Sequence, residues 1–178
     1  FDRHDEQRFA SGGVRSRRQF RYGRFEVRMK LPSEPGHWPA AWLMTKSVNR
    51  VGKEGRDGTE IDIMESPWRD RDWIQHALHW DGYGLEHQQR SKRAEVPGIQ
   101  DGWHTYALDW SEDGYIFFID GVETWRTAAG GVCRVPLHLL LTDETGTWGG
   151  NPEDADSLPD DTRIDYVRVW QQAEPDAP

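Results

Sequence analysis

Apolar and polar residues alternate along most of this chain with a period of two, which is the period of a β-strand. In the segment 24–31 every second residue is apolar and the residues between are charged, so we expect a strand with one buried and one solvated face. Strand-like runs recur at 103–126, 135–141 and 163–170. No helical stripe of ten or more residues separates them, which excludes a parallel sheet built from alternating strands and helices.

Turn signals divide these runs into short antiparallel strands. Asp-Gly pairs at 113–114 and 120–121 predict two tight turns, so 103–126 should form a three-stranded meander. Many short strands joined by turns predict an all-β fold, an antiparallel β-sandwich of two sheets. The chain has 178 residues without internal repeats or a linker, so we expect a single domain over 1–178.

One strand-like run, 60–65, breaks the pattern because it carries three carboxylates. In a regular strand Glu60 and Asp62 point to one face, and the isoleucines that follow them point to the other. Met64 adds one residue to this alternation. If a β-bulge absorbs the extra residue, Glu65 returns to the face of the first two acids.

Three carboxylates on one face suit the chemistry of a retaining glycosidase. Such an enzyme needs two carboxyl groups about 5 Å apart, one as the nucleophile and the other as acid and then base. A third acid can hold a proton beside them, because mutual repulsion and burial oppose full ionisation. Four strand steps span about 13 Å, so only a concave, bulged strand with converging side chains meets this requirement. On spacing alone, a metal site or a solvated edge strand explains the acids equally well.

The sequence around this motif carries a family resemblance. The matching segments are 22–32 (Tyr-Gly-Arg-Phe-Glu-Val-Arg-Met-Lys-Leu-Pro), 36–43 (Gly-His-Trp-Pro-Ala-Ala-Trp-Leu), 103–110 (Trp-His-Thr-Tyr-Ala-Leu-Asp-Trp), Asp120-Gly121 and 165–170 (Asp-Tyr-Val-Arg-Val-Trp). Together with 60–65 they resemble glycoside hydrolase family 16, which includes laminarinases, lichenases, agarases, carrageenases and porphyranases. The resemblance covers nearly the whole chain. It implies a concanavalin-like jelly roll with a concave substrate cleft and the motif strand in its middle.

The resemblance also implies a role for each acid. Glu60 corresponds to the nucleophile, Asp62 to the residue that assists it, and Glu65 to the acid/base. The extra Met64 resembles the bulged form of the motif, found in laminarinases, agarases and carrageenases. The implied activity is a retaining, endo-acting glycoside hydrolase that cleaves a β-linked polysaccharide by double displacement, with β-1,3- or mixed β-1,3/1,4-glucan favoured.

Three alternatives stay open. The segments 65–68, 79–83 and 142–144 depart from the laminarinase pattern, so a galactan hydrolase of the agarose, porphyran or carrageenan type remains an alternative. A transglycosylase would share every catalytic residue, because a sugar replaces water in its second step. A non-catalytic carbohydrate-binding module can use the same fold. Members of the family usually carry further residues before the segment that matches 1–20, so we expect the N-terminal strand region to be short or missing here.

Ten tryptophans in a chain of low mean hydropathy suit stacking on sugar rings. The candidate substrate-binding residues are Trp38, Trp42, Trp68, His79 and Trp148. The resemblance places His79 beside the acid/base, although a lone histidine on a strand is as often structural. We expect the tryptophans within strand-like runs, Trp103, Trp110, Trp125 and Trp170, to pack in the core. The long segments 81–101 and 143–161 are expected to be loops that form the rims of the cleft.

The net charge of −9 argues against a nucleic-acid partner, because phosphate binding requires concentrated Lys and Arg. Six arginines within 15–28 favour the solvated face of two neighbouring strands, with contact to an acidic polysaccharide as the alternative. No apolar run has the length of a membrane span, so no membrane partner is expected. Cys133 is the only cysteine, which excludes an intrachain disulfide.

The remaining expectations concern cofactors and location. Asp165 matches an aspartate that helps to bind structural calcium in many relatives, so it is the candidate metal ligand. Hydrolysis itself should require no cofactor. We expect a monomer that binds a polysaccharide or oligosaccharide substrate. No signal-like segment opens the chain, but a polymer too large to cross a membrane must be met in the extracellular space or the periplasm.

Overall fold

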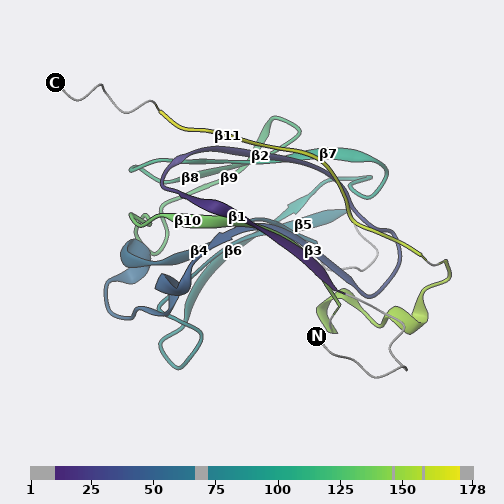
Figure 1. The fold of residues 1–178 in the computed structure, drawn as a ribbon, viewed down its shortest axis with the longest axis horizontal. Helices are drawn as coiled ribbons and strands as arrows, with labels where there is room; N and C mark the ends of the chain where they lie inside the picture. Colours follow the sequence, from purple (N-terminus) through teal and green to yellow (C-terminus); the bar gives the residue numbers. More distant parts are fainter. Residues whose placement is uncertain (1–10, 67–71, 146, 158, 173–178) are drawn as a thin grey trace.

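The structure is a computed structural model that describes residues 11–66, 72–145, 147–157 and 159–172. Within these ranges, two antiparallel sheets lie one above the other (Figure 1). The six-stranded sheet contains, in spatial order, β1 (Gly12–Phe20), β10 (Leu137–Thr145), β3 (His37–Met44), β4 (Thr59–Glu65), β5 (Trp73–Trp80) and β6 (Gln88–Glu95). The five-stranded sheet contains β11 (Arg163–Trp170), β2 (Gly23–Lys30), β7 (Trp103–Trp110), β8 (Tyr115–Ile119) and β9 (Val122–Thr127). The predicted all-β fold of two antiparallel sheets is confirmed.

Short 3-10 helices lie in the connections between strands. They are η1 (Lys46–Asn49), η2 (Glu54–Asp57), η3 (Thr147–Gly149) and η4 (Pro152–Asp154). Across the described ranges, no helix has both the length and the apolar character that a membrane span requires. Strands β7, β8 and β9 form the predicted meander, with hairpin turns at the two Asp-Gly pairs.

The core lies between the two sheets, where strands such as β2 and β8 contribute every second residue. On β2, Phe25, Val27 and Met29 are fully buried, whereas the charged residues between them are partly exposed. The ring of Phe25 packs against Trp110 of β7, with the ring centroids 6.4 Å apart. Burial of one such apolar side chain contributes about 1.5–3 kcal/mol to folding. Only one face of the six-stranded sheet is used for this packing, so its other face is free for a binding site.

Strand β4 runs through the middle of the six-stranded sheet and carries the predicted bulge. Ala41 and Trp42 are consecutive on β3, yet they pair with Met64 and Asp62, which leaves Ile63 without a partner of its own. The register between β4 and β5 shifts at the same place. Ile63 and Met64 are both fully buried in the core. The bulge therefore absorbs one residue, as the sequence predicted, and the strand regains its earlier facing immediately after Met64.

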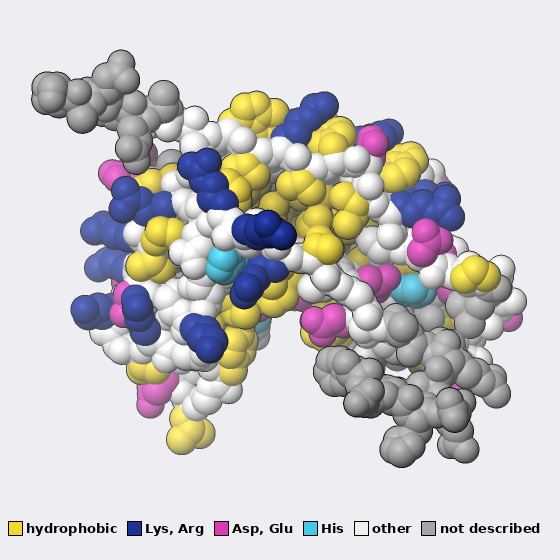
Figure 2. All heavy atoms as spheres, in the orientation of Figure 1, with side chains coloured by type: hydrophobic (Ala, Val, Ile, Leu, Met, Phe, Trp, Pro, Cys, Tyr) yellow, Lys and Arg dark blue, Asp and Glu magenta, His cyan; other side chains and the backbone are white. Residues whose placement is uncertain are grey.

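The six-stranded sheet is arched, and its concave side faces away from the five-stranded sheet (Figure 1). Figure 2 shows a hollow beneath this arch, between the turn after β5 and the opposite end of the molecule. Because side chains alternate across each strand, the hollow is lined by the residues that do not enter the core. The predicted concave cleft therefore has a physical counterpart on the free face of this sheet.

Two of the tryptophans assigned to the core lie elsewhere. Trp103 and Trp170 keep 39% and 47% of their surface exposed. They pair with Lys30 and Arg24, which lie on the outer face of the five-stranded sheet, so the alternation of the strands directs both rings outward. The prediction was wrong for these two. It was correct for Trp110, which is buried, and Trp125 packs against the core while partly exposed.

Two further expectations need correction. The segment 81–101 is not one long loop, because β6 occupies 88–95 as an edge strand with a single buried residue, Ala94. With one buried position there is no apolar alternation to detect in the sequence. The arginines of 15–28 do not share one face either, because β1 and β2 follow each other in the chain but belong to different sheets.

Candidate active site

Three carboxyl groups lie on the concave face of β4. Glu60 and Asp62 pair with His79 and Ala77 of β5, and Glu65 pairs with Gln75 beyond the bulge. Asp62 is 3% exposed and Glu65 is 9% exposed, and carboxylates are seldom buried so deeply. The charges of Glu65 and Glu60 raise the pKa of Asp62, and the charge of Glu60 also raises that of Glu65, so the three groups lie within electrostatic reach of one another.

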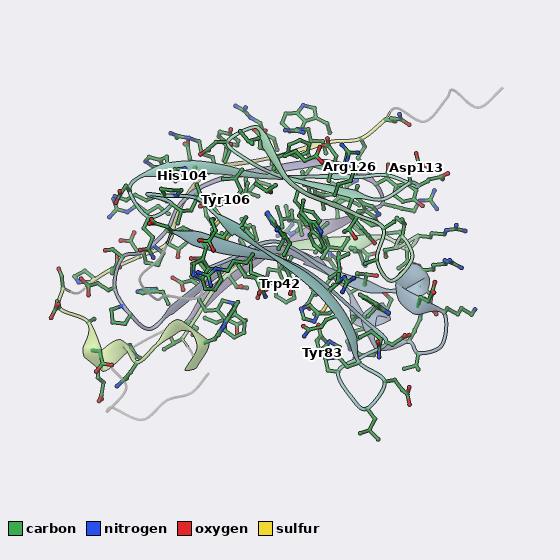
Figure 3. All side chains as sticks on the ribbon, turned by 180° about the vertical axis from the view of Figure 1, so that it is seen from behind. Trp42, Tyr83, His104, Tyr106, Asp113 and Arg126 are labelled. Carbon is green, nitrogen blue, oxygen red and sulfur yellow. The ribbon has the colours of Figure 1, made fainter. Side chains whose placement is uncertain are left out.

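Glu60 is held from outside its own strand. The hydroxyl of Tyr83 donates a hydrogen bond to Oε2 of Glu60, with an O–O distance of 2.5 Å. Tyr83 lies in the connection between β5 and β6, and in Figure 3 it lies with Trp42 on the concave side of the sheet. Burial raises the pKa of Glu60, the Tyr83 hydrogen bond opposes this shift, and the charge of Glu144 adds to it.

Asp62 is the most deeply buried of the three acids. Its Oδ2 has no hydrogen-bond partner among the described residues, and Nε2 of His79 lies 3.5 Å away. Burial, followed by the charges of Glu65 and Glu60, raises the pKa of Asp62 well above its ordinary value. Burial and His87 lower the pKa of His79 to about 4. The imidazole of His79 is therefore neutral near neutral pH, so its contact with Asp62 is not an ion pair there.

Glu65 has the properties of a general acid. The indole N–H of Trp38 donates a hydrogen bond to Oε1 of Glu65 at 3.1 Å. Burial, and to a lesser degree the charge of Glu60, raises the pKa of Glu65 to about 7, although the hydrogen bonds from Trp38 and Gln75 act in the opposite direction. A carboxyl group with this pKa can be protonated when substrate binds and can accept a proton later in the cycle.

Two of the predicted tryptophan platforms lie on the same face as the acids. Trp38 and Trp42 are half-buried on β3, and the indole N–H of Trp42 donates to the hydroxyl of Thr142 at 3.2 Å. Trp148 packs edge-on against Trp38, with centroids 4.9 Å apart, so the 143–161 segment reaches the cleft as expected. The candidate Trp68 lies outside the described residues.

His79 belongs to a cluster of three rings beside Glu60. Its ring stacks on that of His87 with centroids 5.2 Å apart, and Tyr83 lies 6.3 Å from His79 and 5.3 Å from His87. Nδ1 of His79 and Nε2 of His87 share a hydrogen bond of 3.0 Å. The turn 81–87 therefore forms one wall of the cleft. This agrees with the cleft rim predicted for the segment 81–101, of which the turn is the first part.

Within the described residues, one group of three side chains has the spacing of metal ligands. The ligand atoms of Glu60, Asp62 and His79 lie within 4.8 Å of one another. Asp165, the predicted calcium ligand, lies on β11 in the other sheet, and its Oδ2 accepts a hydrogen bond of 2.5 Å from Arg28. Calcium binding at Asp165 stays a prediction.

Sequence reasoning missed Glu144 as a neighbour of the acids. It pairs with Trp38 across β10 and β3, and its charge raises the pKa of both Glu60 and Glu65. The signal was present, because Leu139 and Leu141 enter the core and the even-numbered residues that follow must then face the cleft.

The sequence of this chain is similar to a family model and to curated proteins. The model of the family described as Glycosyl hydrolases family 16 matches residues 4–168. A beta-glucanase of Rhodothermus marinus is 30% identical over 175 residues, which cover 90% of this chain and 61% of the relative. Glucan endo-1,3-beta-glucosidase A1 of Niallia circulans is 27% identical over 92% of this chain and 26% of its own length. The chain thus spans less than two thirds of both curated relatives.

The fold also matches solved structures. A mixed-linkage glucan GH16 protein of Bacteroides ovatus, solved with a G4G4G3G product, superimposes with a TM-score of 0.74 at 25% sequence identity. The match covers 89% of this chain and 74% of that one. Both sequence and fold therefore relate this chain to the same group of proteins.

Proposed function

Because this chain belongs to glycosyl hydrolases family 16, we propose that it is a retaining, endo-acting hydrolase of a β-linked glucan with β-1,3 or mixed β-1,3/1,4 bonds. The observation that carries the proposal is the bulge in β4, which directs Glu60, Asp62 and Glu65 to one concave face. The names of the relatives favour a glucan over a galactan, since they are a beta-glucanase and an endo-1,3-beta-glucosidase.

In the proposed first step, Glu60 attacks the anomeric carbon and the glycosidic C–O bond breaks. Glu65 donates its proton to the departing oxygen, so the leaving sugar is released with a neutral hydroxyl group. A pKa of about 7 lets Glu65 carry that proton near neutral pH. The product of this step is a covalent bond between the carboxyl group of Glu60 and the sugar.

In the second step the ionised Glu65 removes a proton from water, and the water oxygen attacks the same carbon. The bond to Glu60 breaks, so the configuration of the sugar is retained overall. Asp62 would assist by holding a proton in the site, which limits repulsion when its neighbours are ionised. Its burial and raised pKa support this role.

Sugar rings would stack on the tryptophans beside the acids. Trp38 and Trp42 lie on the concave face of β3 with Ala40 between them, and Trp148 extends the aromatic surface past Trp38. Aromatic rings suit the apolar faces of sugars, and their position on a rigid strand orients a bound chain across β4. His79 would contact the sugar bound next to Glu60. A polymeric substrate also implies an enzyme that acts outside the cytoplasm.

The test is a panel of purified polysaccharides followed by sizing of the products. Laminarin and mixed-linkage β-glucan should yield new reducing ends and a ladder of oligosaccharides, as expected for internal cleavage. Agarose, porphyran and carrageenan serve as the comparison set. Cleavage of those galactans alone would replace the glucan assignment, and longer products at high oligosaccharide concentration would indicate transglycosylation.

A further inference from the structure

We propose that Tyr83 is a positioning residue for Glu60, which fixes one carboxylate oxygen so that the other faces the sugar. The proposal rests on the function inferred above, because it assumes that Glu60 is the nucleophile. It extends that function by assigning a role to the turn between β5 and β6.

The first argument is the hydrogen bond itself. Tyr83 lies in the turn after β5 and Glu60 lies on β4, yet the hydroxyl oxygen of Tyr83 and Oε2 of Glu60 are 2.5 Å apart. Burial, followed by the hydrogen bond and charge of Glu60, raises the pKa of Tyr83 above its ordinary value. The phenol therefore stays protonated wherever a glycosidase works, and it always acts as the donor. Glu60 can use Oε2 as the acceptor and keep Oε1 for attack.

The second argument is that Tyr83 is itself held in place, although 53% of its surface is exposed. Its ring packs beside those of His79 and His87. The base of the turn is anchored as well, because Gly82 N–H donates to the carbonyl of Val48 at 2.8 Å. Because Tyr83 is held in place, its hydroxyl restricts the Glu60 carboxylate more strongly than a water molecule would. The carboxylate therefore loses less conformational freedom when the transition state forms.

Two consecutive residues give the turn its shape. Asp81 and Gly82 both have positive φ angles, 58° and 74°. The Oδ1 of Asp81 accepts a hydrogen bond from Gly52 N–H at 3.0 Å. This contact compensates in part for the strain of a non-glycine residue in the left-handed region. The backbone is thereby reversed and directs Tyr83 back over the cleft toward Glu60.

A competing role for Tyr83 is contact with the sugar. An exposed ring beside the nucleophile could act as a stacking platform, in which case the ring matters and the hydroxyl does not. The substitution Tyr83→Phe separates the two roles, because it keeps the ring and its packing but removes the donor. Loss of the donor should raise the pKa of Glu60, since the hydrogen bond now opposes the effect of burial.

The experiment compares wild-type protein, Tyr83→Phe and Tyr166→Phe on laminarin and mixed-linkage β-glucan. Tyr166 is the matched control, because its hydroxyl donates to Oε1 of Glu26 at 2.9 Å on the outer face of the five-stranded sheet. For Tyr83→Phe we expect kcat to fall roughly tenfold, in the range of one charged hydrogen bond, with little change in KM. The acidic limb of the pH profile should move to higher pH, because Glu60 must be ionised to attack. Tyr166→Phe should match the wild type.

An unchanged kcat and pH profile in Tyr83→Phe, or a defect confined to KM, would overturn the proposal. A second measurement separates its failure from that of the proposed function. Titration of the Glu60 carboxyl carbon by NMR reports its pKa without any substrate. If the wild type cleaves neither glucan, the proposed function fails. An equal pKa of Glu60 in wild type and Tyr83→Phe would then reject the Tyr83 contact as well, whereas a higher pKa in the variant would support the contact on its own.

Discussion

Trp38 and Glu65 are joined by a hydrogen bond of 3.1 Å between the indole N–H and Oε1. One tryptophan thus offers a ring to the sugar and also restrains the residue proposed to protonate the leaving group. The bond lowers the pKa of Glu65 and so opposes the larger effect of burial. A sugar that stacks on Trp38 would therefore contact the side chain that is hydrogen-bonded to Glu65, the residue that controls proton transfer.

Removal of this bond should change the alkaline side of the pH profile. The substitution Trp38→Phe keeps an aromatic ring but deletes the donor, so the pKa of Glu65 should rise. Because a general acid must be protonated, activity should persist to higher pH, with a shift of a few tenths of a unit to one unit. The profile of kcat/KM measures this shift. Trp42→Phe is the control, since its N–H contacts Thr142 instead of an acid.

Glu144 should act in the opposite direction. Its charge raises the pKa of Glu65, so Glu144→Gln should lower that pKa and move the alkaline limb to lower pH. The side chain is exposed, and solvent screening should keep the shift to a few tenths of a unit. The same pH profile measures it. A shift in the same direction as that of Trp38→Phe would contradict the electrostatic account of this cleft.

The two outer acids should be indispensable for cleavage. Glu60→Gln removes the nucleophile and Glu65→Gln removes the proton donor, and each should lower kcat by about a thousandfold or more. Binding of laminarin should be nearly unchanged, because the tryptophans remain. Reducing-end assays and affinity electrophoresis measure the two properties. Glu123→Gln, an exposed acid on β9, is the matched control, and near-normal turnover in either active-site variant would refute the assignment.

Stability should fall as pH rises through the range in which Glu65 ionises. The folded state holds the proton of this carboxyl group more tightly than the unfolded chain, since its pKa is raised from 4.5 to about 7. Its contribution is therefore complete below pH 4.5 and is lost as pH rises toward 7.

Thermal melting of the wild type and Glu65→Gln between pH 4.5 and 7.5 tests this linkage. The variant cannot ionise at this position, so its melting temperature should decline less, by several degrees for a chain of this size. Parallel slopes in the two proteins would show that Glu65 does not ionise differently in the folded and unfolded states. Glu123→Gln, whose carboxyl group lies outside the cleft, should behave as the wild type does.

Much of the fold follows from the period-two pattern. The strand predicted at 163–170 is β11. The bulge predicted near Met64 is also present, and it returns Glu65 to the face of Glu60. These features depend on local alternation, which a sequence displays directly. Edge strand β6 has almost no buried residues, so its sequence resembles a loop.

The contacts that complete the site could not be derived in the same way. Tyr83 reaches Glu60 because positive φ angles at 81–82 reverse the chain, and no hydrophobic pattern specifies that direction. Trp103 was misassigned because alternation alone does not say which face of a strand meets the core. Long-range pairing decides both, and it is visible only when the sheets are assembled.

The bulge in β4 also bears on how such a motif can vary in length. Ile63 and Met64 occupy the place of one residue, so the strand on either side of them keeps a common phase. A homologous strand one residue shorter would preserve the orientation of its outer acids. Loss of one amino acid, which elsewhere in a sheet turns every downstream side chain to the opposite face, would at this position leave the acids on one face.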